Sequence, residues 1–465
     1  MDAATHPART SRRAAAARAL PALLFLSSFA VFLGSPNHQM TDSGYALLVG
    51  ENLIRHGDLD LGRYQLESVR GSNYRLEHTG AHTFYFFPVG SSLLSIPFVA
   101  LSHLAGQSIV RPDGTYATKV EGQEEAILAA LLMAVFTVIV FSTARLILPL
   151  PTSLAVALVT AFGTQIYSTA SRTLWSDTWA LVLVAGAIHL LLRSPARGEG
   201  RRFFWLATLE CWATFVRPTS GLTLAATTFY LLMVDRRASW AFFATAAFWL
   251  AAFAADSLRR FGTPFPSYFH DRLGPPSAEA LLGTLLSPSR GLLVCVPAAL
   301  AVGWICWRHR KALRFAPLIR VAVAVCLAHW LMISAFDKWW GGHCFGARLA
   351  TGMVPWLALL AILGLEGARR ASPATPAPRH RAPAAVLALL CGLSIAINSV
   401  GAISARAVAW NLRPANVDLD TARLWSWRHP QALAGFVAAP PDNPTPPPTP
   451  PPTPTPRPTP TPAGR

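Results

Sequence analysis

Charged side chains are scarce in this chain of 465 residues. They make up 14% of the sequence, and only three of them are lysines, Lys119, Lys311 and Lys338. Soluble globular proteins carry about 25% charged residues, whereas here hydrophobic residues reach 52%. The composition therefore excludes an ordinary soluble enzyme or binding domain.

Cysteine is also sparse, and nucleotide-binding motifs are missing. Five of the six cysteines lie within apolar runs and only Cys344 lies in a loop, so neither a disulfide framework nor a zinc-ligand spacing is present. There is no G-x-G-x-x-G after a strand and no Walker loop. These absences argue against a soluble nucleotide substrate, and we expect no cofactor.

What the sequence has in abundance is long hydrophobic runs. A bilayer core about 30 Å thick requires roughly 20 apolar residues per helical span. Nearly uncharged runs of suitable size occur at 20–35, 84–106, 126–144, 152–171, 178–192, 203–216, 218–234, 238–255, 291–307, 321–336, 349–365 and 382–405. The sequence therefore predicts an all-α fold, a polytopic transmembrane helix bundle.

The net charge of +17 reports topology and gives no reason to expect a nucleic-acid partner. The basic residues are dispersed in short loops between the apolar runs, and short loops rich in Arg and Lys mark the cytoplasmic side of a membrane. We therefore place the basic segment 1–19 in the cytoplasm and the protein in the cell membrane as a multi-pass protein. Residues 36–177 then begin and end on the extracytoplasmic side.

Three apolar runs lie between those two extracytoplasmic points, and an odd number of crossings is impossible. The run 84–106 contains Pro88 and Pro97, which interrupt helical hydrogen bonding. We predict that it lies in the outer interface or re-enters, within an outside loop at 36–123 that holds interfacial helices. About eleven spans remain, with the C-terminus extracytoplasmic. Twelve spans with a different orientation downstream are the alternative.

The remaining boundaries follow from composition. Residues 20–405 form the predicted transmembrane domain, and 406–438 form an extracytoplasmic C-terminal segment. Residues 439–465 are dominated by proline and threonine, which form neither a helix nor a sheet ladder. This tail is predicted to be disordered and extended, in the manner of polyproline II.

Three predicted outside loops carry polar groups that a membrane anchor does not require. Asp42 follows the first run, Asp177 begins another, and FDKWWGGHCFGARL at 336–349 gathers Lys338, Trp339, Trp340, His343 and Arg348. Charged groups near a membrane are costly and mark functional sites. Structural alternatives remain open: Asp42 or Ser43 could cap a helix that begins near Tyr45, and Asp177 could cap another. The tryptophans and cations could form an interfacial belt.

These loops resemble the GT-C superfamily of glycosyltransferases and its bacterial dolichyl-phosphate-mannosyltransferase-like branch. The resemblance rests on TDSGYALLVGENLIRHG, YFFPVGSSLLSIPF, SRTLWSDTWAL, LLSPSRGLLVCVP, WWGGHCFGARL and RLWSWRHPQAL. It implies an inverting transfer of a sugar from a polyprenyl-phosphate carrier to a lipid, glycan or protein acceptor on the extracytoplasmic side.

Carried over, the resemblance makes Asp42 the general base for the acceptor hydroxyl and Asp177 a contact for sugar hydroxyls. Lys338, His343 and Arg348 have the charge to hold the lipid phosphate, and Trp339 and Trp340 suit a sugar or lipid surface. Many members carry a second carboxylate beside the first, but here Ser43 follows Asp42. We therefore expect no metal site.

Two other classes of function remain open. A lipid or sugar transporter, or a flippase, would require charges buried within spans, for which His189, Glu210, Arg217 and His329 are the candidates. A catalytically inactive membrane scaffold is conceivable because Ser43 replaces an acidic residue.

Overall fold

The computed structural model describes residues 7–64, 66, 73–193, 199–234, 239–266, 268, 274–371 and 381–437. The predicted tail at 439–465 lies outside the described residues. The N-terminal elements are α1 (Pro7–Leu33), α2 (Ala46–His56), η1 (Gly62–Tyr64), β1 (Leu76–Thr79), β2 (His82–Tyr85), α3 (Gly90–Leu104), α4 (Thr118–Arg145), α5 (Leu150–Phe162), the π-helix η2 (Ile166–Ala170), α6 (Ser176–Leu192) and α7 (Glu199–Val216).

The second half is also almost entirely helical. It contains η3 (Pro218–Ser220), α8 (Gly221–Val234), α9 (Trp240–Phe261), α10 (Ala278–Leu286), α11 (Leu292–Cys295), α12 (Ala298–Arg308), η5 (Arg310–Ala312), α13 (Ala316–Ile333), η6 (Arg348–Met353), α14 (Val354–Ala371), α15 (Arg381–Ile403), α16 (Ala405–Ala409), η7 (Thr421–Trp425) and η8 (Gln431–Leu433).

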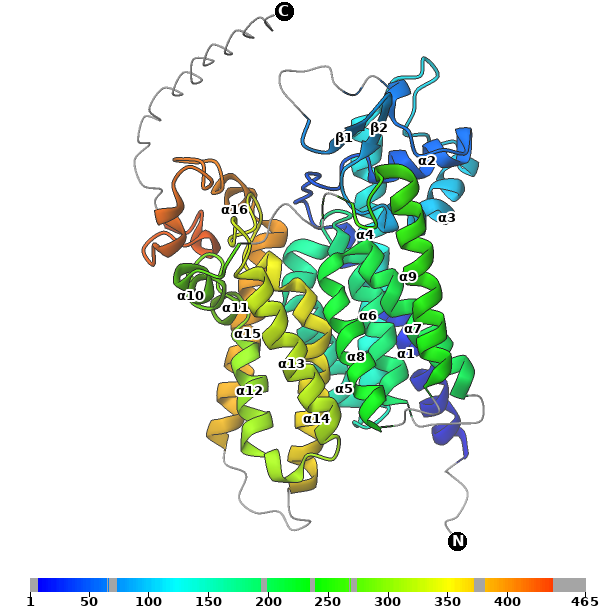
Figure 1. The fold of residues 1–465 in the computed structure, drawn as a ribbon. Helices are drawn as coiled ribbons and strands as arrows, with labels where there is room; N and C mark the ends of the chain where they lie inside the picture. The colour runs from blue at the N-terminus through cyan, green and yellow to red at the C-terminus, as the bar shows by residue number, and fades with distance from the viewer. Residues whose placement is uncertain are drawn as a thin grey trace, which may run out of the picture.

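The long helices lie side by side in an elongated bundle (Figure 1). Among the described residues, five helices are long and apolar enough to cross a bilayer: α4, α9, α13, the continuous η6–α14 helix and α15. Six shorter apolar helices accompany them. The fold is mostly helical, as predicted, whereas the number of about eleven spans stays a prediction.

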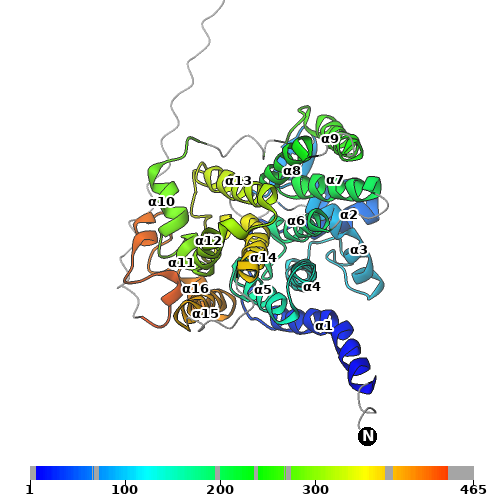
Figure 2. The same ribbon diagram turned by 90° about the horizontal axis from the view of Figure 1, so that it is seen from below.

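Burial separates central from peripheral helices. Viewed along the bundle, α4, α6 and α14 lie near its centre, and α1, α9 and α15 lie towards its edge (Figure 2). In α4, the small residues Ala129, Ala130 and Ala134 are fully buried, which lets neighbouring helices approach closely. In α9, by contrast, Phe248 is 64% exposed, as expected of a helix that packs against lipid.

The first predicted outside loop contains more than helices. Helices α2 and α3 lie with the strands β1 and β2 at one end of the bundle (Figure 1). The strands pair antiparallel, with Leu76 opposite Tyr85 and Thr79 opposite His82. This hairpin corrects the purely α-helical prediction: its strands span only four residues each, too short to stand out in a hydrophobic pattern.

The C-terminal end of α1 and the residues after it contact the loop that follows η2. Arg172 is 2% exposed and donates to the backbone oxygens of Phe32 and, at 3.1 Å, Ser35. These carbonyls lie at and just beyond the C-terminal end of α1, where a helix leaves acceptors unsatisfied and where a cation is favourable. Arg172 thereby holds the segment that leads to Asp42 against the segment that leads to Asp177.

Candidate functional site

Asp42 lies in the connection between α1 and α2. Its Oδ2 forms an ion pair with Arg348 Nη2 at 2.8 Å, although the two residues are 306 positions apart. The Tyr74 hydroxyl donates to Asp42 Oδ1 at 3.4 Å, and the Tyr85 hydroxyl donates to the Asp42 backbone oxygen at 2.6 Å. The carboxylate remains 30% exposed, so it is held in place and can still reach a ligand.

The two tyrosines near Asp42 are protonated donors. Burial raises the pKa of Tyr74 above its ordinary value, and the neighbouring charge of Asp42 raises it further. Burial also raises the pKa of Tyr85 well above the usual range. Both hydroxyls therefore keep their protons at neutral pH. The β-hairpin region, which the sequence did not predict, thus supplies hydrogen bonds to Asp42.

The capping role considered for Asp42 and Ser43 is filled by another residue. The residue before α2, Tyr45, adopts φ 81° and receives no side-chain cap. Instead the carboxylate of Glu121, at the start of α4, accepts hydrogen bonds from the backbone amides of Tyr45, Leu47 and Leu48 at 2.8 to 3.1 Å. Asp42 is thereby left for its ion pair with Arg348.

A second buried carboxylate lies behind Ser43. The Ser43 hydroxyl donates to Glu125 Oε2 at 2.7 Å, and Thr173 donates to the same oxygen. Glu125 is fully buried on the first turns of α4. The serine that interrupts the expected acidic pair is therefore bonded to an acid from a different helix.

Arg348 stands at the start of η6 and joins two of the predicted loops. Its guanidinium carbon lies 3.5 Å from the ring centroid of Trp175, and Nη1 donates to the Gly341 oxygen at 3.3 Å. Its Nε is buried and has no partner among the described residues. The stack fixes the plane of the guanidinium, and a donor remains available.

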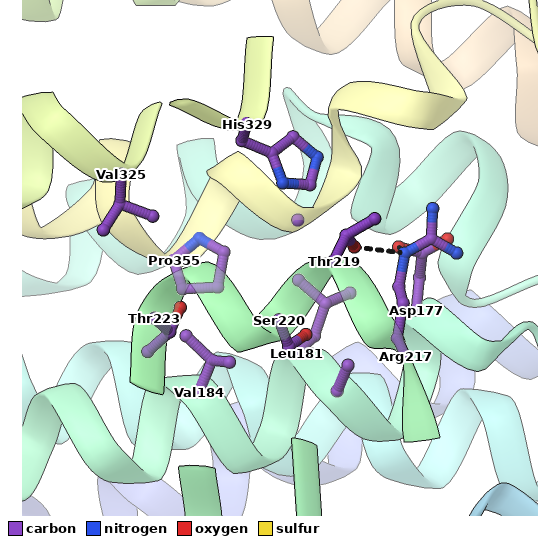
Figure 3. Close-up of a pocket in the computed structure, with 12 residues that line it drawn as sticks. Asp177, Leu181, Val184, Arg217, Thr219, Ser220, Thr223, Val325, His329 and Pro355 are labelled. Atoms are coloured by element: carbon purple, nitrogen blue, oxygen red, sulfur yellow. Dashed lines mark hydrogen bonds and ion pairs between the residues drawn. The ribbon is translucent and has the colours of Figure 1, made fainter. Parts of the chain in front are cut away.

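Asp177 lies on the first turn of α6, and Arg217 Nε approaches its Oδ1 at 2.9 Å. Trp175, the residue before α6, makes no side-chain cap, and the Asp177 carboxylate is 1% exposed. Figure 3 shows Arg217 beside Asp177 and bonded to Thr219, with His329 across the same cavity. The cavity measures about 10 Å³, room for about one water molecule.

Lys338 and His343 point to a different part of the molecule. Lys338 Nζ pairs with Asp418 at 2.7 Å, and His343 Nε2 lies 2.7 Å from the side-chain oxygen of Asn416. Trp340 donates to the other oxygen of Asp418 at 2.8 Å. The structure therefore brings Asp42, Asp177 and Arg348 near Trp175, and directs Lys338, Trp340 and His343 to the C-terminal segment.

Trp339 also belongs to the second group. It is 5% exposed and packs in a cluster with Ala280, Trp410 and Leu424. A Cβ atom on Gly283 would lie only 2.4 Å from its ring, so glycine is required where α10 crosses this tryptophan. Trp339 is a buried anchor for the C-terminal segment.

Two residues that the sequence did not single out connect this segment to the bundle. Arg290, 2% exposed, donates to the side-chain oxygens of Gln431 and Asn411 and to the Trp340 backbone oxygen. Gln431 in turn donates to the Cys344 oxygen at 2.9 Å and accepts from the Gly346 amide at 3.1 Å. The only signal was the presence of both residues in the quoted motifs LLSPSRGLLVCVP and RLWSWRHPQAL.

One of the comparisons with known proteins found a match. Residues 115–257 match the family model of the dolichyl-phosphate-mannose-protein mannosyltransferases. This stretch is similar to a glycosyltransferase domain of the GT-C superfamily. The resemblance found in the loops is thereby confirmed, and the match supports a membrane glycosyltransferase of the GT-C type.

The match covers α4 to α8 and most of α9. It includes Asp177 and the three buried glutamates of α4, Glu121, Glu124 and Glu125, but neither Asp42 nor Arg348. No curated protein and no solved structure matches the chain. Within the described residues, no group of three or more His, Cys, Asp or Glu side chains is placed to hold a metal ion.

Proposed function

We propose that the protein transfers a sugar from a polyprenyl-phosphate donor to an acceptor hydroxyl, with inversion at the anomeric carbon. The observation that carries this proposal is the Asp42–Arg348 ion pair beside Trp175. It brings a carboxylate and a guanidinium together from segments 306 positions apart, which supports a base beside a group that binds an anion.

The chemistry requires both groups. The acceptor oxygen attacks the anomeric carbon, its proton passes to the Asp42 carboxylate, and the bond from that carbon to the phosphate oxygen breaks. The bonding electrons leave with the phosphate, whose growing negative charge is stabilised by a cation. Attack on the face opposite the leaving phosphate inverts the configuration.

Arg348 suits the phosphate better than the lysine of the same loop. Its planar guanidinium can form two parallel hydrogen bonds with phosphate oxygens, and the stack on Trp175 fixes its orientation in advance. The unpartnered Nε supplies a further donor. A donor phosphate that engages Arg348 would draw it away from Asp42 and leave the carboxylate to accept a proton.

Asp177 acts in this scheme as a positioning residue. Its cavity is too small for a sugar ring, and its charge is balanced by Arg217. It lies two residues after Trp175, on which Arg348 stacks. Asp177 therefore holds the start of α6, and with it the ring that orients Arg348.

The proposal places the protein in a cell membrane, with the N-terminus in the cytoplasm and the transfer on the opposite side. The substrates are then a polyprenyl-phosphate-linked sugar and a lipid, glycan or protein acceptor. The lipid chain requires a path between helices, and the peripheral helices with exposed apolar side chains, such as α9, offer surfaces that lipid can contact.

A transporter or flippase is the second candidate, and one residue favours it. Glu210 of α7 is fully buried and accepts a hydrogen bond from Thr227 of α8 at 2.7 Å, while its other oxygen has no partner among the described residues. A carboxyl group within an apolar helix is typical of a transport path. Glu210, however, is flanked by tightly packed apolar side chains, including Cys211 and Ala207.

The proposal can be tested with the purified protein in lipid vesicles. Radiolabelled polyprenyl-phosphate sugars, beginning with mannose and extending to other hexoses and pentoses, are supplied, and release of the sugar and relocation of the lipid are measured separately. We expect sugar release, with a loss on the order of 100-fold for Asp42→Asn. Asp113→Asn, in the exposed turn before α4, is the matched control.

The alternatives predict different results. Relocation of the lipid without sugar release, abolished by Glu210→Gln, would establish the transporter. A wild-type protein that neither cleaves nor relocates any of these lipids would establish the scaffold. Full turnover by Asp42→Asn would remove this carboxylate as the base.

A further inference from the structure

The C-terminal segment 406–437 contains a second hollow, separate from the residues around Asp42. It has a volume of about 480 Å³, which lies within the range of small-molecule sites. Figure 1 places this segment, with α16, at the end of the bundle that also carries β1 and β2. Within the described residues, the partners of Asp42 and Arg348 in hydrogen bonds, ion pairs and ring contacts do not line it.

The lining of the hollow is strongly cationic. It includes Arg406, Arg413, Arg423 and His429, and no acidic side chain lines it. Arg423 lies 4.4 Å from the ring centroid of Trp410 and donates to the backbone oxygens of Arg413 and Ala415. A guanidinium held in this way keeps its position whether or not a ligand is present.

Arg413 is the cation available for a ligand. Arg406 uses one nitrogen to donate to the Gly435 oxygen at 3.0 Å, whereas the Arg413 side chain is exposed and has no partner among the described residues. The His429 ring is similarly without a partner in the described part of the chain. Three guanidinium groups around one hollow repel one another unless an anion lies between them.

The rim of the hollow is apolar. Leu433, Phe436 and Val437 line it and are 44%, 76% and 40% exposed. The segment starts immediately after α15, a helix long and apolar enough to cross a bilayer, and Arg406 comes three residues after its last residue, Ile403. Basic residues next to the end of a span attract anionic lipids.

We propose that this hollow binds the phosphate headgroup of an anionic membrane lipid, with the acyl chains against the apolar rim. The guanidinium groups neutralise the phosphate, and Leu433 and Phe436 contact the start of the chains. This lipid is not the sugar donor, since the hollow shares no residue with the proposed transfer site. The inference therefore does not depend on the proposed function.

Binding can be measured by native mass spectrometry of the full-length protein in neutral detergent. The probes are short-chain phosphatidylglycerol, short-chain phosphatidylcholine and glycerol phosphate, which has the anionic group but no acyl chains. We expect phosphatidylglycerol to bind more tightly than phosphatidylcholine. Glycerol phosphate should displace it only at much higher concentration, because glycerol phosphate cannot use the rim.

Arg413→Gln removes the free cation without removing a protein contact. We expect it to weaken phosphatidylglycerol binding about tenfold, the effect of losing one charged hydrogen bond. Arg428→Gln is the matched control, because Arg428 is an exposed arginine of the same segment that does not line the hollow. It should leave binding unchanged.

Three results would overturn the proposal. Equal binding of phosphatidylcholine and phosphatidylglycerol would show that the charge is not used. Displacement by glycerol phosphate at the same concentration as the lipid would assign the hollow to a soluble phosphate. Equal effects of Arg413→Gln and Arg428→Gln would show only a general attraction of the basic surface for anions.

Discussion

The loop that runs from Lys338 to Arg348 has a cation at each end, and the two cations have different partners. Arg348 is 12% exposed, stacks on Trp175 and pairs with Asp42. Lys338 is 61% exposed and pairs with Asp418 of the C-terminal segment. The loop therefore connects the proposed transfer site to that segment, and the type and burial of each cation correspond to its task.

Charged residues that cluster in the sequence therefore need not form one site. Gly341 and Gly342, between the two cations, have φ values of 74° and 68°, which only glycine adopts without strain. This reversal of the chain turns Lys338 and Arg348 towards different neighbours. Predictions that separate the two ends of the loop can therefore test the division.

The largest expected effect is on the reaction of engineered cysteines with a reagent that cannot cross the membrane, because this reaction is all or none. We predict that both the segment before α4 and the C-terminal segment face the outside of the cell. The cysteine added in Asp113→Cys or in Thr421→Cys should then react with an impermeant maleimide in intact cells. The parent chain, which has only its six native cysteines, should not react.

If only one of the two engineered cysteines reacts, the segment before α4 and the C-terminal segment lie on opposite sides of the membrane, and the predicted topology is wrong. Reaction of Asp113→Cys only after the cells are lysed would restore a crossing by 84–106 and the alternative of twelve spans.

The next effect concerns activity. Arg348→Lys keeps the charge but loses the stack on Trp175 and the paired hydrogen bonds to phosphate, so kcat/KM should fall about 10- to 100-fold. Lys338→Arg keeps both the charge and the contact with Asp418, and should change kcat/KM by less than about threefold.

The two variants are compared in the same sugar-release assay, and their binding of polyprenyl phosphate is compared with that of uncharged polyprenol. Arg348→Lys should weaken binding of the phosphorylated lipid alone. Equal, mild effects of both variants would favour an interfacial belt, in which either cation is a sufficient anchor.

The sequence was sufficient to predict a mostly helical bundle, but it could not predict which polar residues of the loops would pair. Long apolar runs specify helices by themselves, so α6 to α9 closely match their predicted runs. The Asp42–Arg348 pair depends on how segments 306 positions apart pack together, which no local pattern encodes. Glu121 likewise falls within the predicted outside loop 36–123. Only the packing of α4 against α2 shows that its carboxylate accepts hydrogen bonds from the backbone amides at the start of α2.

The C-terminal segment shows the same limit. Its short helices have no periodicity that would identify a core, and it is held by polar side chains, among them Arg290, Gln431 and Asn411. Such contacts depend on distance and direction rather than on hydrophobic spacing. The hairpin β1–β2, with four residues in each strand, escaped prediction for a related reason.

A smaller effect, on stability, should distinguish two contacts that hold the C-terminal segment: the buried hydrogen bonds of Arg290 and the exposed ion pair between Lys338 and Asp418. Arg290→Met removes a buried guanidinium and leaves the acceptors on Asn411 and Gln431 without their donor, at a cost of about 3 kcal/mol. Lys338→Met removes an exposed ion pair worth about 1 kcal/mol or less.

Thermal unfolding of the purified variants and protease release of the C-terminal segment measure this difference. Arg290→Met should lower the unfolding temperature and hasten cleavage, with Lys338→Met close to the wild type. A reversed order would mean that the exposed pair, and not the buried network, fixes the segment.

The smallest effect is on pH dependence, and it is confined to the exposed end of the loop. Burial alone would raise the pKa of Asp418, but the hydrogen bonds from Lys338 and Trp340, together with the charge of Lys338, hold it below its usual value. A carboxyl group whose pKa is lower in the folded state stabilises that state above its unfolded pKa, and the contribution is lost as the pH falls through the lowered value. The segment should therefore be held equally well from pH 8 to about 5, and released more readily by protease only below about pH 4.

Asp418→Asn should abolish this acid step while leaving the rate of protease release at neutral pH nearly unchanged, because its amide can still accept a hydrogen bond from Trp340. An acid step of the same size in Asp418→Asn would assign it to another group.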